Sequence, residues 1–193
     1  LRADGSVITW GISAFGGNSS SVENKIKTTT HADFQQVTSI VATGSAYAAI
    51  RADGSVVTWG NSLEGGDSSS VASEIDGDTD GHDVVQVYAT TSAFAALRKD
   101  GSVITWGDAN NGGTSTDIAS SINGGTDVTA IYSTNNAFAA LRSDGSVITW
   151  GDGNSGGNST TVSSDLDGTV NVSKIFATTS AFAALREDGK VVT

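Results

Sequence analysis

The sequence contains no cysteine, proline or methionine, and only 16% of its 193 residues are charged. Without cysteine the chain cannot build a disulfide framework, a thiolate zinc site or a cysteine nucleophile. No apolar run approaches the about 20 residues that a membrane-spanning helix requires, so we expect no membrane span. These absences exclude small disulfide-rich proteins, zinc-ribbon modules and thiol-dependent enzymes.

Basic residues are also scarce, with 10 Lys and Arg against 21 Asp and Glu, a net charge of -11 and a pI of about 4.3. An acidic surface repels phosphate backbones, so we expect no nucleic-acid partner. Gly, Ser, Thr, Asn and Asp are abundant, which suits short strands joined by turns better than helices. The acidic, cysteine-free and lysine-poor composition favours an extracellular or cell-surface location in a bacterium.

One motif recurs along the whole chain. An Asp-Gly dipeptide returns every 44–49 residues, and in the first four copies a tryptophan follows the aspartate by six residues. A fixed period of this length is typical of stacked structural repeats. We divide the single array 1–193 into units at about 1–36 (partial), 37–83, 84–127, 128–171 and 172–193 (partial). The expected structural anchors are the recurring aspartates and tryptophans: Asp4, Asp53, Asp100, Asp144, Asp188, Trp10, Trp59, Trp106 and Trp150.

Three segments of each unit have the sequence pattern of strands, for example 128–134, 137–142 and 146–151. Asp144-Gly145, between the last two, predicts a tight hairpin, because glycine readily adopts the positive φ that such turns need. An aliphatic pair four residues apart after the glycines fits one helical turn or a short fourth strand. We predict an all-β fold of tandem 44–49-residue repeats, each with three to four antiparallel strands. The repeats would form β-propeller-like blades, in closed rings or in an open or superhelical array.

The segment 137–157, AFAALRSDGSVITWGDGNSGG, resembles the repeat of the regulator-of-chromosome-condensation superfamily. It is most similar to the short-repeat branch typified by a bacterial β-lactamase-inhibitory protein. The resemblance implies seven-bladed β-propellers, whereas about four and a quarter repeats are present here, so we expect a slice of a giant bacterial repeat protein. The family's Gly-x-x-His before the second strand is missing, and its chromatin functions are not carried over. The shared pattern lies on Ala140, Leu141, Asp144, Gly145, Val147, Ile148, Trp150, Gly151 and Gly156.

The segment 76–83, DGDTDGHD, is the sharpest local motif. Asp76, Asp78 and Asp80 alternate and are followed by a glycine and Asp83, as in the first half of a calcium-binding loop. The twelfth position of such a loop would be Val87 instead of the usual glutamate. Two interpretations stay open: an acidic hydrated loop, which is favoured, and a Ca²⁺ site formed by the four aspartates. The fold itself requires no cofactor.

An arginine stands two residues before each hairpin aspartate. Strict recurrence favours a structural ion pair across the hairpin or to the next repeat over an anion-binding ladder. His31 and His82 do not recur, and no serine or acid is arranged around them in a catalytic pattern, so no catalytic residue is assigned. The five arginines are Arg2, Arg51, Arg98, Arg142 and Arg186.

Two functional hypotheses follow. The first is a non-enzymatic structural protein, a segment of a large acidic bacterial cell-surface or extracellular protein that forms a fibre, coat or adhesin. Its partners would be neighbouring repeats or copies of itself. The alternative is a propeller-type binding module whose loop tips, such as 12–15 and 61–64, contact a protein or a glycan. Phe15 is an aromatic residue in the first tip, but its counterparts are Glu64, Asn111 and Ser155, so it is not a repeated anchor.

Overall fold

The computed structural model describes residues 1–27, 29–77 and 83–193. Its strands form four separate three-stranded antiparallel sheets, each ordered as in the sequence with the second strand in the middle. The first two sheets contain β1 (Val37–Ala42), β2 (Ala46–Arg51), β3 (Val56–Gly60), β4 (Val84–Ala89), β5 (Ala93–Arg98) and β6 (Val103–Gly107). The other two contain β7 (Val128–Ser133), β8 (Ala137–Arg142), β9 (Val147–Gly151), β10 (Val172–Ala177), β11 (Phe182–Arg186) and β12 (Val191–Val192).

The sequence after the paired glycines of each repeat is compatible with either a helical turn or a fourth strand. The structure has short helical turns there. The structure therefore has three strands in each sheet, and β3, β6 and β9 are each followed by two 3-10 turns. The N-terminal segment carries η1 (Ser13–Phe15), η2 (Ser20–Val22) and the single helical turn α1 (Glu23–Ile26). The later repeats carry η3 (Ser62–Glu64), η4 (Ser69–Glu74), η5 (Ala109–Asn111), η6 (Thr116–Ser121), η7 (Gly153–Ser155) and η8 (Thr160–Asp165).

The Asp-Gly turn closes the hairpin between the second and third strands. In the turn from β8 to β9, Asp144 Oδ1 accepts hydrogen bonds from the Ser146 backbone N–H at 3.0 Å and from the Ser146 hydroxyl at 2.6 Å. Gly145 has a φ of 78°, in the left-handed region that favours glycine. Its carbonyl then accepts the N–H of Val172 at 2.9 Å, where the next sheet begins. The same dipeptide thus makes the turn and joins one repeat to the next.

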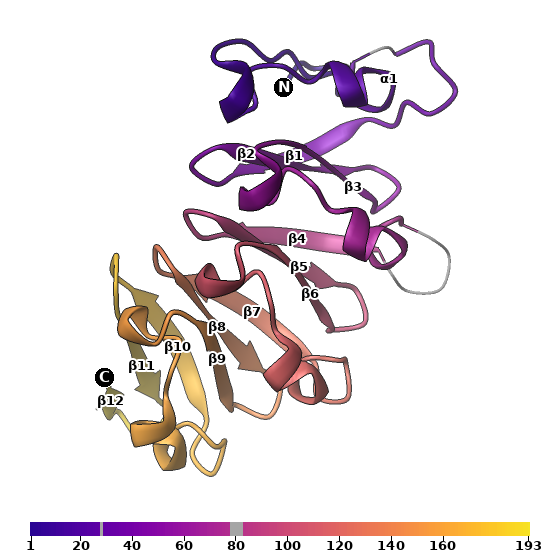
Figure 1. Ribbon diagram of the computed structural model, residues 1–193. Helices are drawn as coiled ribbons and strands as arrows, with labels where there is room; N and C mark the ends of the chain where they lie inside the picture. The colour runs from indigo at the N-terminus through magenta and orange to yellow at the C-terminus, as the bar shows by residue number, and fades with distance from the viewer. Residues whose placement is uncertain (28, 78–82) are drawn as a thin grey trace.

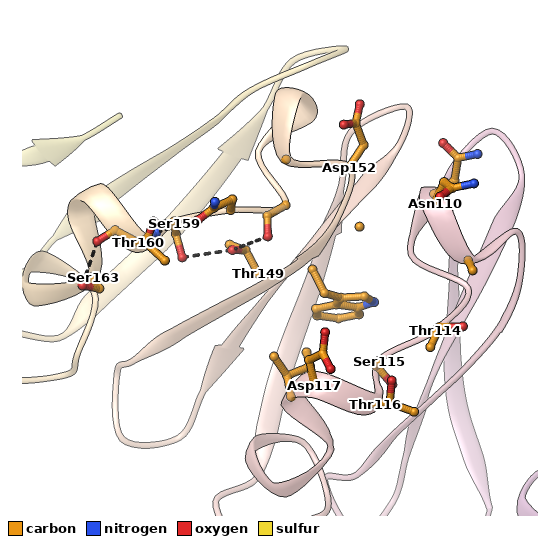
Figure 2. Close-up of a pocket in the computed structure, with 18 residues that line it drawn as sticks. Asn110, Thr114, Ser115, Thr116, Asp117, Thr149, Asp152, Ser159, Thr160 and Ser163 are labelled. Atoms are coloured by element: carbon orange, nitrogen blue, oxygen red, sulfur yellow. Dashed lines mark hydrogen bonds between the residues drawn. The ribbon is translucent and has the colours of Figure 1, made fainter.

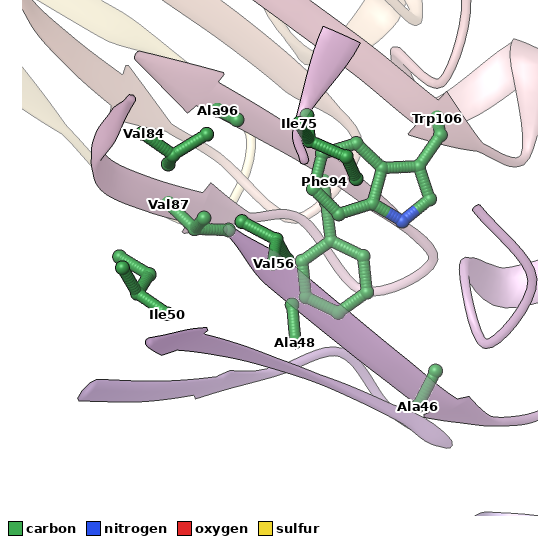
Figure 3. Packing of buried hydrophobic residues seen from close by; sticks show 10 residues of the cluster. All are labelled: Ala46, Ala48, Ile50, Val56, Ile75, Val84, Val87, Phe94, Ala96 and Trp106. Carbon is green, nitrogen blue, oxygen red and sulfur yellow. The ribbon is translucent and has the colours of Figure 1, made fainter. Parts of the chain in front are cut away.

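The hydrophobic cores lie between consecutive sheets. Val56 and Ile75 of one repeat pack in a single buried cluster with Val87, Phe94 and Trp106 of the next repeat (Figure 3). A lone three-stranded sheet leaves one face uncovered, and here the neighbouring sheet covers it. Figure 1 shows the result, an open fan of four sheets with the N-terminal segment over one end and β10–β12 at the other. The all-β, propeller-like repeat array expected from the sequence is confirmed.

Backbone hydrogen bonds also link equivalent turns of successive repeats, at the connection between the first and second strands. The N–H of Gly44 donates to the carbonyl of Thr91 at 2.7 Å, and the N–H of Thr91 donates to Asn135 at 2.8 Å. The N–H of Asn135 in turn donates to Thr179 at 2.9 Å. Four repeats are therefore connected by a continuous line of main-chain bonds along one end of their sheets.

Candidate functional site: interfaces and grooves between repeats

Three of the four recurring tryptophans lie buried between repeats. The indole of Trp106 stacks on Phe94 with ring centroids 5.2 Å apart and an interplanar angle of 27°. Its Nε1–H donates to the carbonyl of Gly65 in the preceding repeat at 3.0 Å. Gly65 can only be glycine at this contact, because a Cβ would lie 2.5 Å from the Phe94 ring and its φ is 96°. Trp59 and Trp150 repeat the arrangement on Gly16 and Gly112.

Trp10 is the exception, since 82% of its surface is exposed. It occupies the same place in its motif as the three buried tryptophans. Leu1, Ile8, Ile12 and Phe15 in the same N-terminal segment are exposed as well. One end of the fan therefore presents large apolar side chains that are of the same kind as those buried between the repeats.

Four of the five recurring arginines make ion pairs with their hairpin aspartates, as the sequence predicted: Arg51, Arg98, Arg142 and Arg186. The Nη2 atoms of Arg98 and Arg142 lie 3.0 Å and 3.6 Å from the carboxylates of Asp100 and Asp144. Arg98 also donates from Nη1 to the carbonyl of Glu74 in the preceding repeat at 3.4 Å. Both guanidiniums pair within their own hairpin and Arg98 also reaches the preceding repeat, which supports a structural role.

The hairpin carboxylates of Asp4 and Asp144 are stabilised in their charged form. The Ser146 hydroxyl, hydrogen-bonded to Asp144, holds the pKa of that carboxyl below its ordinary value; burial opposes this, while the Ser146 N–H and nearby Arg142 add to it. The pKa of Asp4 is lowered in the same way by Ser6. Asp4 and Asp144 thus favour the ionised state that forms the turn.

We expect the stability of the fold to fall as the pH drops below about 4, the ordinary pKa of an aspartate. The pKa of Asp144 is lower in the folded chain than in the unfolded chain, so its ionised carboxylate stabilises the fold at pH values above the unfolded-state pKa. This stabilisation is lost as the pH falls through the folded-state pKa. Urea unfolding between pH 2 and 6 measures the loss. The substitutions Asp144→Asn and Ser146→Ala should each make the loss of stability at low pH smaller. Variants with the same acid profile as the unsubstituted chain would contradict the stabilisation of the Asp144 carboxylate by Ser146.

The structure brings no metal site together within the ranges it describes. There, no group of three or more His, Asp or Glu side chains could hold an ion. Of the calcium candidates, Asp76 and Asp83 are described, whereas Asp78 and Asp80 lie outside the described residues. Asp83 lies 4.0 Å from Lys99 Nζ. The Ca²⁺ hypothesis therefore stays a prediction, to be checked by calorimetric titration.

Of the two histidines, only His31 lies within the described residues. His31 Nδ1 accepts a hydrogen bond from the backbone N–H of Asp33 in an exposed turn, and His82 lies outside the described residues. Among the described residues no helix is long and apolar enough to cross a membrane.

A groove of about 960 Å³, lined by both polar and apolar side chains, lies between the outer turns of the last two fully formed repeats. Figure 2 shows Asn110, Thr114 and Asp117 from one repeat and Thr149 and Thr160 from the next around it. The walls are held locally, because the Thr149 hydroxyl donates to the Ser159 hydroxyl at 2.9 Å. Hydroxyl, amide and carboxylate groups are suited to hydrogen-bond a sugar or a peptide backbone.

The groove recurs one repeat earlier with a volume of about 480 Å³, where Ser62 and Ser70 face Asp108 and Ala109. Nothing in the local sequence around these serines and threonines indicates a groove. Their signal was positional: hydroxyl residues occupy equivalent positions before and within the second 3-10 turn of successive repeats. Only the stacking of sheets brings the two walls together.

No protein-family model and no curated protein matches the sequence. Solved structures do match. Prp20p from Saccharomyces cerevisiae, whose structure was described with its binding to Gsp1p and histones, has a TM-score of 0.58 and 22% identity over 81% of this chain and 44% of that one. Yeast RCC1 (Prp20) bound to Kap60 has a TM-score of 0.52 and 19% identity, over 81% and 43%. The CRINKLY WD40 ectodomain of the Arabidopsis thaliana receptor kinase ACR4 has a TM-score of 0.53 and 20% identity, over 82% and 52%.

These similarities establish the fold. The repeats fold like those of RCC1 (Prp20), in line with the resemblance of the sequence motif, and the chain spans about half the length or less of the matched proteins. The neighbours are propeller-type proteins whose own structures include protein complexes.

Proposed function

We propose that this chain is a non-enzymatic structural segment of a large bacterial extracellular or cell-surface protein, part of a fibre, coat or adhesin. The observation that carries the proposal is the repeated inter-repeat contact. Trp59, Trp106 and Trp150 each bury an indole against an aromatic ring and donate to a glycine carbonyl of the preceding repeat. The recurring side chains are devoted to stacking one repeat on another, which is how extended arrays are built.

The charge of the chain fits the same role. A net charge of -11 keeps long chains soluble. The absence of cysteine means that folding depends on no redox environment, so the array is compatible with export.

We expect antibodies raised against residues 1–193 to label intact cells of the source organism. An antibody against a cytoplasmic protein serves as the control and should label only permeabilised cells. Immunogold electron microscopy then shows whether the label follows a continuous surface layer or thin projections. Labelling confined to permeabilised cells would overturn the proposed location and with it the structural role at the surface.

The groove between the outer turns favours a second candidate, a binding module for a protein or glycan. Its polar lining provides hydrogen-bonding groups from two repeats at once, and the matched structures include protein-bound propellers. Saturable binding of an oligosaccharide or peptide on an array of such ligands would favour this role. That binding should be weakened by Asn110→Ala in the groove and retained in Lys174→Ala, on β10 outside it.

A further inference from the structure

The grooves between the outer turns form a series. All eight residues that line the smaller groove, of about 480 Å³, have an equivalent one repeat later in the lining of the larger groove. Ala109 of η5 lines both, so the two grooves meet at this turn. A third groove of about 560 Å³ shares Ser70 with the smaller one and residues 114–116 with the larger one. We call these three grooves the outer furrow, which crosses three repeats and is lined by residues between 62 and 163.

The larger groove presents polar side chains that have no partner within the protein. Asn110, Thr114 and Asp117 are exposed on one wall of this groove. Within the described chain none of the three side chains forms a hydrogen bond or an ion pair. Figure 2 shows them on one side of the groove, with Asp152 and Thr160 on the other. One amide, one hydroxyl and one carboxylate are therefore free to bind a ligand.

The charges of the two grooves that meet at η5 restrict the ligand. Asp117 and Asp152 stand on opposite walls of the larger groove, and Asp67 and Asp108 do so in the smaller one. Among the described residues, neither lining includes a Lys, Arg or His. A ligand that carries phosphate, sulfate or uronate groups would meet like charges at close range, which opposes its binding. The grooves therefore favour a ligand without negative charge.

The lining suits a sugar better than a peptide. Hydroxyl and amide side chains both donate and accept hydrogen bonds, as sugar hydroxyls do, and apolar surface between them can contact the C–H faces of sugar rings. A bound peptide usually relies on pockets that hold its side chains. The large apolar residues of the larger groove are Ile118, which is half-buried, and Trp150, which is 5% exposed. They leave little apolar area to anchor peptide side chains.

We propose that the outer furrow binds an uncharged linear glycan, which lies across successive repeats. The free carboxylate of Asp117 accepts hydrogen bonds from sugar hydroxyls, and such charge-assisted bonds are roughly twice as strong as neutral ones. Asn110 and Thr114 bind neighbouring hydroxyls on the same wall. The smaller groove, one repeat earlier, binds a more distant part of the same glycan. This inference rests on the second candidate function, the binding module, and names the class of its ligand.

A glycan array with neutral, amine-bearing and anionic linear glycans tests the ligand class on the 193-residue chain. We expect binding to neutral glycans and none to sulfated or uronate-bearing ones. Titration calorimetry of the strongest neutral ligand should give the same affinity at about 0.05 and 0.5 M NaCl, because screening does not act on an uncharged ligand. An array without a bound neutral glycan, or binding confined to amine-bearing glycans and lost at high salt, would overturn the proposal.

Substitution of Asp117 tests the site. Asp117→Ala should raise the dissociation constant of the strongest neutral glycan at least about tenfold, as expected for the loss of a hydrogen bond to a charged group. Glu187→Ala is the matched control, because it removes an exposed carboxylate outside the furrow and changes the net charge equally. Its affinity should equal that of the unsubstituted chain. Equal affinities of the two variants would show that Asp117 does not contact the glycan and would overturn the assignment.

The length of the glycan tests the path across repeats. An oligomer long enough to reach both grooves should bind at least about tenfold more tightly than a disaccharide, because the second contact is made by an already bound chain. Ala109→Trp, at the turn where the grooves meet, should remove this gain. Equal affinities for both lengths would overturn the path. Binding of peptides in place of glycans would overturn this inference and retain the binding module, and surface labelling of cells concerns neither.

Discussion

Trp106→Ala is expected to lower the free energy of unfolding by about 3–5 kcal/mol, the cost of truncating a large buried aromatic side chain. The indole is 2% exposed, stacks on Phe94 and donates to the carbonyl of Gly65. Alanine would leave a cavity between two repeats and an unpaired buried carbonyl. For a chain of this size the loss corresponds to a fall in Tm of roughly 6–20 °C, at about 2–4 °C for each kcal/mol.

The matched control for this substitution is Trp10→Ala, at the same place in the motif but 82% exposed. In dilute monomeric samples it should change the free energy of unfolding by less than about 0.5 kcal/mol, as surface substitutions usually do. Urea denaturation followed by circular dichroism measures both variants. Equal destabilisation by the two would mean that the tryptophan acts within its own repeat instead of through the contact with the preceding one.

Gly107→Ala should destabilise the chain more than Gly11→Ala, although both glycines end the same ITWG motif. Their φ angles are 107° and 110°, so alanine is strained at both by about 1–3 kcal/mol. At Gly107 the new Cβ would also lie 2.7 Å from the Ser92 carbonyl oxygen and 2.9 Å from the Ala93 Cα. At Gly11 nothing lies within 4 Å.

The difference between the two variants isolates the steric part of the effect. A clash with backbone atoms of β5 cannot be relieved by rotating a side chain, so it should add about 1–3 kcal/mol to the cost at Gly107. Chemical denaturation of both variants under identical conditions gives this difference. Equal losses would show that only the positive φ matters at the end of the third strand.

The hairpins and the strands could be predicted because their signals are local. Asp144-Gly145 specifies its turn through one carboxylate and one positive φ, and residues 137–142 alternate in hydrophobicity and form β8 with the same bounds. The local sequence after the third strand does not distinguish a helical turn from a fourth strand. Val71 and Ile75 are four residues apart, which suits a short strand as well as a 3-10 turn, and the structure has η4 there.

The groove could not be predicted because its two walls belong to different repeats. Asn110 and Thr149 are far apart in the sequence, and only the rotation between successive sheets brings their turns together. The sequence identifies the tryptophans as recurring anchors. It does not show which face of the sheet they lie on, because that depends on how successive sheets stack. Which tryptophans are buried is therefore a property of the three-dimensional array.

The line of main-chain bonds through Gly44, Thr91, Asn135 and Thr179 has a consequence for how such a chain can evolve. A bond between a backbone N–H and a carbonyl makes no demand on the side chain, and these four equivalent positions indeed hold three different residue types. Mutations can accumulate at this rim while the spacing of the repeats stays the same. Duplication or deletion of a whole repeat by recombination would likewise preserve this line of hydrogen bonds. The array can therefore change in length without a new kind of contact between repeats having to evolve.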